Sequence, residues 1–458
     1  MNFINLIMIK ILSYKRLYNL MFSFFGAGIT FALLYGALNS VPLLDDYSWP
    51  SAFKEFGGFV DVQFIFYERV NGRVLSTFFS TLLLNNSVFY GHYGFVLVLF
   101  ILGSSYLYFK LFYKLTDSRA FLSISLSILI NLFLVANSKQ LATQFFWLTG
   151  VLVYQLSFIL ALIAIIFYFG EYKFKWLVIF FTSFLSVLAF EMVVFLFVPL
   201  ILVLELRKLR SNYKAIIGLS SIMAFSLLIN LKAPGTSIKS EEYSAVITED
   251  FFLSMKTAFE HLMRFLLDGQ FITLLAFGII LYIARLTFNI HKQINSSPVL
   301  LSLLVICNHL VFQFIYFYKI GNRVAPRVEN FLNIFDFVIV ILFVFSLRLL
   351  KFNIKLQPLF LTLSFSMIVL PFVRVSNLGL LIGDAKNGRM NAYKFQMERR
   401  YDLIENCQSE VCLVPKIQNI PYSIFYQPLP SDSVSNNSFY CSQLGDFYNK
   451  AWVFTDEN

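Results

Sequence analysis

Apolar stretches long enough to cross a lipid bilayer recur along most of this chain. The first runs from Tyr18 to Leu38, and we interpret it as an anchored helix. Runs of roughly 15 to 23 residues follow it, and this length spans about 30 Å of hydrocarbon at 1.5 Å per helical residue. Only 14% of the 458 residues are charged, whereas soluble domains are about a quarter charged. The sequence therefore predicts an integral membrane protein.

We predict about eleven membrane-spanning helices. After the first, they lie near 93–113, 120–137, 147–169, 176–190, 192–206, 215–231, 270–287, 298–318, 329–350 and 357–375. Helices satisfy their backbone hydrogen bonds internally, so we expect an all-α polytopic bundle. The runs at 176–190 and 192–206 are short and separated only by Glu191, which leaves tilted and partly re-entrant arrangements open. Residues 251–266 mix apolar repeats with charges and predict an amphipathic helix on the outer surface.

The distribution of charge predicts the orientation. Six segments that we assign to the cytoplasm, 1–17, 110–119, 170–175, 205–214, 285–297 and 348–356, hold 17 Lys and Arg against three acids. An excess of Lys and Arg marks cytoplasmic loops. The N-terminus is therefore expected inside, with the loop at 40–90 and the C-terminus outside. No basic tract is interleaved with aromatic residues as in a nucleic-acid groove, so we expect no nucleic-acid partner.

Composition divides the chain into a transmembrane domain, residues 1–375, and a small extracytoplasmic module, residues 376–458. Polar residues and prolines return in the module. Three of the four cysteines lie there, and an oxidising compartment would permit Cys407–Cys412 or Cys412–Cys441 as a disulfide. Three unpaired thiols are an equally open alternative.

The first outer loop carries the strongest site signal. Asp45 and Asp46 follow the first helix directly, and Arg73 follows in the same loop. A carboxylate there can act as a general base or bind a divalent cation, and a guanidinium can hold a phosphate with two hydrogen bonds. The alternative is that the acids cap an interfacial loop and that Arg73 anchors to lipid headgroups.

Other outward residues are further candidates. Lys232, in KAPGTSIK, and Arg323 and Arg327, in GNRVAPRVEN, are cations that could bind phosphate, although Lys232 also fits an ordinary interfacial loop. Ionisable residues in spans usually face the bundle interior or a wet cavity. We therefore include three acids as cavity candidates, Glu191, Glu329 and Asp336. Trp147, in FFWLTG, is a fourth candidate because it could line a sugar or lipid pocket, and the alternative is an ordinary membrane or interfacial aromatic residue. Pairing of Glu329 or Asp336 with the nearby arginines is an equally good account of those two acids.

Four segments in order resemble marks of the GT-C superfamily of membrane glycosyltransferases. These are DDYSW after the first helix, NGR in the same loop, FFWLTGVLVYQLS at a later helix start, and KAPGTSIKS. More narrowly, they resemble a group of bacterial membrane proteins within it. The resemblance implies a GT-C-like bundle in a bacterial cytoplasmic membrane.

What the resemblance implies about activity is inverting transfer of a sugar from a polyprenyl-phosphate donor to an envelope glycan, lipid or protein acceptor. Asp45 or Asp46 would deprotonate the acceptor, basic groups would hold the lipid phosphate, and a divalent cation, Mg²⁺ or Mn²⁺, is an option at either Asp. The alternative is a flippase or polymerase of envelope polysaccharide, although we find no internal repeat of the kind expected in a transporter. A non-enzymatic membrane assembly protein is the third interpretation.

Overall fold

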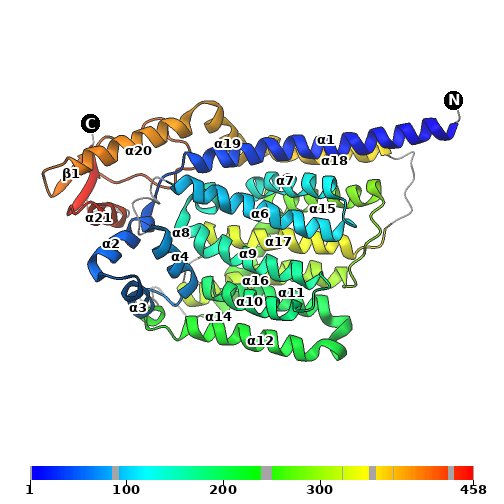
Figure 1. Ribbon diagram of the computed structural model, residues 1–458, viewed down its shortest axis with the longest axis horizontal. Helices are drawn as coiled ribbons and strands as arrows, with labels where there is room; N and C mark the ends of the chain where they lie inside the picture. Colours follow the sequence, from blue (N-terminus) through cyan, green and yellow to red (C-terminus); the bar gives the residue numbers. More distant parts are fainter. Residues whose placement is uncertain are drawn as a thin grey trace.

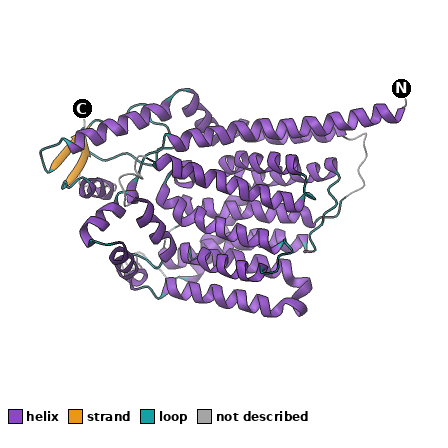
Figure 2. Cartoon of the chain, in the orientation of Figure 1, coloured by secondary structure: helices purple, strands orange, loops and turns teal. Residues whose placement is uncertain are grey.

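The computed structural model describes residues 3–84, 92–238, 250–321, 323–349, 357–374, 376–431 and 438–456. Helices dominate the described chain, and two short strands lie together at one end (Figure 2). The long helices run side by side, with the N-terminus at one end of the bundle and α2, α3 and the C-terminal elements at the other (Figure 1). The predicted all-α class is confirmed at this level.

The helices of the bundle are α1 (Phe3–Leu38), α6 (Tyr93–Leu115), α7 (Ala120–Asn137), α8 (Leu148–Gly150), α9 (Leu156–Tyr168), α10 (Lys175–Ala189), α11 (Val193–Glu205), α12 (Leu209–Leu231), α14 (Phe251–Leu267), α15 (Gly269–Phe288), α16 (Pro298–Ile320), α17 (Pro326–Ser346) and α18 (Gln357–Arg374). Short turns of other helix types are η2 (Ala142–Phe146), η3 (Val151–Gln155) and η4 (Leu206–Lys208).

A helix occupies each predicted span position. Among the described residues, eight helices are long and apolar enough to cross a membrane: α1, α6, α7, the continuous α8–α9 segment, α12, α15, α16 and α17. The helices α10 and α11 have 15 and 13 residues, as short as the sequence predicts. The chain is thus a multi-pass membrane protein, and the total of eleven crossings stays a prediction.

Large apolar side chains cover the outside of the bundle. Phe24 is 75% exposed, Phe31 71% and Leu177 66%. An exposed apolar surface of this kind is unfavourable in water and favourable against lipid. Between the helices, buried apolar side chains form one continuous core, with α17 enclosed near its centre.

Local sequence signals set several helix ends. Ser297 accepts a hydrogen bond from the Leu300 amide, Pro298 occupies the first turn of α16, and Gly321 ends that helix in the left-handed conformation. Asp250 caps α14 in the same way, through the Leu253 amide. A helix forms at the predicted position 251–266, as α14, and it packs along α16. Its place on the outer surface stays a prediction.

The predicted loop at 40–90 folds into short helices where it is described. These are η1 (Leu44–Asp46), α2 (Ser48–Phe56), α3 (Phe59–Arg69) and α4 (Val74–Leu84). They cover one end of the bundle (Figure 1).

The C-terminal part contains α19 (Ser376–Lys386), α20 (Arg389–Glu405), β1 (Val411–Val414), α21 (Ser438–Phe447) and β2 (Trp452–Thr455). Strands β1 and β2 pair in parallel, with Val411 opposite Trp452. Helix α19 packs against α1 and α7, so the chain after residue 376 begins on the bundle itself. A disulfide joins Cys407 to Cys412, which is the first of the two pairings that the sequence left open.

Candidate functional site

The segments DDYSW and FFWLTG contact each other, and NGR contacts KAPG, at the same end of the bundle. The NGR turn packs on the end of α12, where a Cβ atom at Gly72 would lie 2.3 Å from the carbonyl oxygen of Asn230. Gly235 packs equally tightly, since its Cβ would lie 2.4 Å from the Val70 nitrogen. Only glycine fits at such close backbone approaches. The NGR and KAPG motifs, which are far apart in the sequence, therefore pack together as one structural unit.

Asp46 is completely buried and accepts four hydrogen bonds. Its Oδ1 accepts from the amide of Thr149 at 3.0 Å and from the hydroxyl of that residue at 2.6 Å. Its Oδ2 accepts from the Leu43 amide at 2.9 Å and from the Tyr93 hydroxyl at 2.8 Å. Trp49 donates its indole N–H to the Thr149 hydroxyl at 3.1 Å. The Asp46 carboxylate thus fixes the first loop onto the chain segment that follows Trp147.

Asp45 differs from its neighbour in exposure. Its side chain is half-buried, whereas that of Asp46 has no exposed surface. A base that takes a proton from a bound acceptor must be reachable by that acceptor. Of the two acids, Asp45 is therefore the one whose position suits proton transfer, and Asp46 suits a positioning role.

Burial gives Asp46 an unusual titration. Burial raises the pKa of Asp46 from 3.8 to about 6, although its hydrogen bonds oppose the shift. The folded protein therefore keeps a proton that the unfolded chain has lost between these pH values. We expect the free energy of unfolding to fall by about 3 kcal/mol as pH rises through this window, and Asp46→Asn to remove that part of the slope.

Thermal unfolding of the detergent-solubilised protein at pH 4, 5, 6, 7 and 8 checks this expectation. The Tm of the wild type, relative to that of Asp46→Asn, should fall between pH 4 and 6 and stay level above pH 7. Parallel Tm curves for the two proteins would contradict the burial of a titrating carboxylate.

The helix geometry around Trp147 is irregular. Two π-helical turns, η2 and η3, flank residues 147–150. Such turns recur at functional sites because they widen the helix and redirect backbone groups. The Trp147 ring packs on Gly150, where a Cβ would lie 2.5 Å from the ring. The irregularity leaves the Thr149 amide directed at Asp46 and places the Trp147 indole in the site.

Arg327 lies at the start of α17 among aromatic rings. Its guanidinium carbon is 5.6 Å from the centre of the Trp147 ring, and Tyr426 of the C-terminal part stacks on the same indole, with ring centres 6.3 Å apart and planes 9° apart. The indole N–H of Trp147 is buried and has no hydrogen-bond partner among the described residues. A cation and an unused donor thus lie side by side, which suits an anionic or oxygen-rich ligand.

Arg73 is held by Glu191 in a bidentate pair. Its Nε and Nη2 donate to the two carboxylate oxygens at 2.9 and 2.8 Å, and its guanidinium lies 5.1 Å from the Phe190 ring centre. Tyr154 and Tyr316 are within electrostatic range of both Arg73 and Arg327. These two arginines and Glu191 therefore lie in one neighbourhood around Tyr154 and Tyr316.

Tyr47 joins the first loop to the C-terminal part. It is 1% exposed, lies in the small core of that part, and its hydroxyl is 2.6 Å from the Tyr401 hydroxyl and donates to the Pro42 carbonyl. In the DDY motif, Asp46 is thus hydrogen-bonded to the helix bundle, and Tyr47 packs in the core of the C-terminal part.

Tyr47→Ala is expected to loosen the packing of the C-terminal part against the first loop. Loss of a buried aromatic ring typically destabilises by about 3 to 5 kcal/mol, whereas Tyr47→Phe loses only hydroxyl bonds, about 1 kcal/mol. Limited proteolysis should cut Tyr47→Ala faster after residue 376. Tyr422→Ala, at a position 64% exposed on the same part, is the matched control. Equal cleavage of all variants would rule out the joining role.

The other predicted site residues lie in different surroundings. Lys232 is exposed at the end of α12. Arg323 lies 3.9 Å from Glu260, and both are exposed. Glu329 lies 3.9 Å from Lys139 and 3.8 Å from His261. Burial lowers the pKa of His261 to about 4, with nearby cations acting in the same direction, so at neutral pH Lys139 is the cation that faces Glu329. Of the arginine partners expected for Glu329, neither is the observed one.

Asp336 pairs with His309 inside the bundle. The His309 Nε2 and Asp336 Oδ2 atoms are 2.8 Å apart, and the residues are 2% and 0% exposed. The other polar atom of each, Nδ1 and Oδ1, has no partner among the described residues. Asp336 is therefore a buried paired group, separate from Arg73 and Arg327.

A metal ligand set is not assembled by the described residues. They contain no group of three or more His, Cys, Asp or Glu that could hold a metal ion, and the oxygens of Asp46 and Glu191 are already engaged by protein donors. The divalent cation stays a prediction, and no step below depends on it.

Several residues of the site carry no strong sequence signal. Thr149 lies within FFWLTG, but its pairing with Asp46 depends on the π-helical turns that follow from packing. Tyr93 begins a span like many other tyrosines, and Tyr426 lies in a proline-rich tail. The sequence gives only an indirect signal for them. A buried acid such as Asp46 needs hydrogen-bond donors, and an arginine such as Arg327 often stacks on an aromatic ring.

Known proteins offer no further constraint on the site. Comparison of the chain with protein-family models, with curated proteins and with solved structures gave no match.

Proposed function

We propose that this protein is a GT-C-like membrane glycosyltransferase. It transfers a sugar from a polyprenyl-phosphate carrier to an envelope glycan, lipid or protein on the outer face of a bacterial cytoplasmic membrane. One observation carries the proposal: the first-loop acids are fixed, through Thr149, to the segment whose Trp147 packs against Arg327. A base and a phosphate-binding cation are thereby held by one rigid unit at one end of the bundle.

In the proposed reaction, the Asp45 carboxylate takes the proton from an acceptor hydroxyl. The hydroxyl oxygen attacks the anomeric carbon of the donor sugar, and the bond from that carbon to the lipid-phosphate oxygen breaks. The phosphate leaves with the bonding electrons, and Arg327 stabilises its negative charge. Attack opposite the leaving group inverts the anomeric centre.

The remaining residues have supporting roles in this proposal. Asp46 holds Asp45 in place, and Glu191 fixes Arg73, whose bidentate pairing leaves less of its charge for a ligand. Tyr426 stacks on Trp147 and helps to hold the indole beside Arg327, and the unused indole N–H offers a hydrogen bond to a sugar hydroxyl. Lys232 and Arg323 are more distant cations that would attract the charged lipid headgroup.

The orientation belongs to the same proposal. The charge bias places the N-terminus in the cytoplasm and the end with Asp45, Arg327 and the C-terminal part outside. Mass spectrometry of envelope glycans from cells with and without the gene tests the function, because one sugar should be missing without it. Identical glycans and glycolipids in the two strains would refute it.

A second candidate, a proton-coupled flippase for an envelope lipid, is favoured by the His309–Asp336 pair. Buried titratable pairs inside spans often couple transport to protons. Asp336→Asn distinguishes the two functions. A transferase keeps most of its activity in this variant if the protein is folded, whereas a proton-coupled flippase loses lipid translocation measured in reconstituted vesicles.

A further inference from the structure

A polar cavity of about 530 Å³ lies at the bundle end opposite Asp45 and Arg327. Its lining residues are Arg207, Gln293, Asn295, Ser296, Pro298, Ser346, Leu347 and Arg348. Helix α17 connects the two ends, because Arg327 begins it and Ser346 ends it, about 28 Å further along at 1.5 Å per residue. The cavity is therefore separate from the proposed sugar-transfer site.

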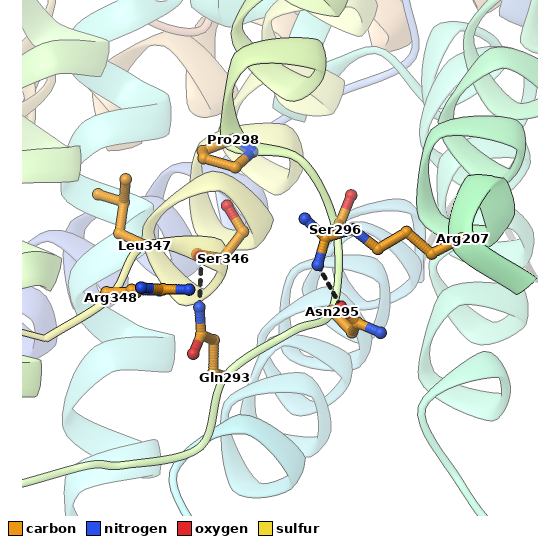
Figure 3. Close-up of a pocket in the computed structure, with 8 residues that line it drawn as sticks. All are labelled: Arg207, Gln293, Asn295, Ser296, Pro298, Ser346, Leu347 and Arg348. Carbon is orange, nitrogen blue, oxygen red and sulfur yellow. Dashed lines mark hydrogen bonds between the residues drawn. The ribbon is translucent and has the colours of Figure 1, made fainter.

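The charge of this cavity is positive. Two of the eight lining residues are arginines and none is acidic. Figure 3 shows Arg207 and Arg348 entering from opposite sides, with their guanidinium ends directed toward the space between them. Neither arginine forms an ion pair with a carboxylate in the ranges that the structure describes. Asparagine and serine side chains add further hydrogen-bonding groups.

The walls of the cavity are fixed by hydrogen bonds. Arg285, which is fully buried, donates to the Lys292 carbonyl at 2.8 Å and to the Leu347 carbonyl at 3.2 Å. The Ile294 amide donates to the Phe345 carbonyl at 2.9 Å. The connection between α15 and α16 is thus held against the end of α17.

Two further bonds complete the frame. Gln293 donates to the Ser346 carbonyl at 3.0 Å, and Ser296 donates to the Val203 carbonyl of α11 at 3.2 Å (Figure 3 shows the first). Arg207 also donates to the Asn295 side chain. These hydrogen bonds connect the end of α17, the α15–α16 connection and the segment after α11, and they fix the shape of the cavity.

We infer that this cavity binds a phosphate group carried on a small polar headgroup. A guanidinium holds phosphate in two hydrogen bonds, and two of them facing one another can share its oxygens. Basic pockets between membrane helices at the cytoplasmic side bind anionic lipid headgroups. Three segments with a predicted cytoplasmic position, 205–214, 285–297 and 348–356, contribute lining residues. An anionic phospholipid of the inner leaflet and a soluble phosphate ester share this chemistry.

Ligand titrations on the purified, detergent-solubilised full chain test the inference. The probes are dioleoylphosphatidylglycerol, sn-glycerol 3-phosphate and, as a lipid without phosphate, dioleoylglycerol. The variants are Arg207→Gln, Arg348→Gln and their double combination. Lys173→Gln removes an exposed cation outside the cavity and is the matched control. Elution volume and Tm verify that each variant is folded.

We expect each single substitution to weaken binding of the phosphate-bearing probe several-fold and the double substitution to weaken it at least tenfold. Lys173→Gln should bind the phosphate-bearing probe as the wild type does. Binding of dioleoylglycerol should not depend on the two arginines. Tight binding of the phospholipid alone identifies a lipid site, and equal binding of glycerol 3-phosphate identifies a soluble ligand. Binding that is unchanged in the folded double variant, or weakened equally by Lys173→Gln, would overturn the inference.

Discussion

Asp45→Asn is expected to reduce sugar transfer at least a hundredfold while the protein still inserts at wild-type levels. The amide cannot accept the acceptor proton, and a positioned general base contributes about 10² to 10⁴ in rate. Asp45 is half-buried, so its replacement by a side chain of the same shape leaves the loop intact. Transfer is measured in membranes by incorporation of labelled sugar from a polyprenyl-phosphate donor.

Two comparisons make this result specific. Glu55→Gln removes an exposed carboxylate from the same loop and should leave transfer unchanged. Asp46→Asn should lower transfer together with thermal stability, because an amide group in place of Oδ2 would face the Leu43 N–H. An Asp45→Asn protein with full activity would remove the proposed base from the mechanism.

Arg327→Gln is expected to have the second largest effect, a loss of about 10² in kcat/KM. The lost interaction stabilises the charge that develops on the departing phosphate, so kcat should fall more than substrate affinity. Arg327→Lys keeps the charge but loses the flat contact with Trp147, and an intermediate rate is expected. Steady-state kinetics over a range of donor concentrations separate the two parameters.

The control for this effect is Arg399→Gln, at an exposed position on α20. It removes the same charge from the same end of the bundle without touching the aromatic cluster. Equal losses in Arg399→Gln and Arg327→Gln would show that only general electrostatic attraction is involved. Unchanged kinetics in Arg327→Gln would place phosphate binding elsewhere.

Much of the architecture could be predicted because the bilayer imposes a simple rule on sequence. Each predicted apolar run contains a helix. Helices α10 and α11 are short because the apolar runs that form them are short. The helix predicted at 251–266 also formed. The folded state of the 40–90 segment was harder to anticipate. Its short helices depend on packing over the bundle end rather than on a strong periodic pattern.

The sequence indicated which residues are candidates for the site, but it did not indicate which side chains they contact. The sequence pointed to Asp45, Asp46, Arg73 and Glu191, but carried no indication that Arg73 and Glu191 pair with each other. For Glu329 and Asp336 it left open a pairing with the nearby arginines. Packing instead assigns His309 to Asp336 and Lys139 to Glu329. Such choices depend on contacts between helices far apart in the chain, which spacing within one helix does not encode.

The central claim is tested most directly by the level of polyprenyl-phosphate sugars in cells. Lipid extracts are compared by mass spectrometry from cells with the wild-type protein, with Asp45→Asn and without the protein. One polyprenyl-phosphate sugar should accumulate to the same extent in the last two strains and return to a low level with the wild type. Identical polyprenyl-phosphate sugars in all three strains would contradict the account.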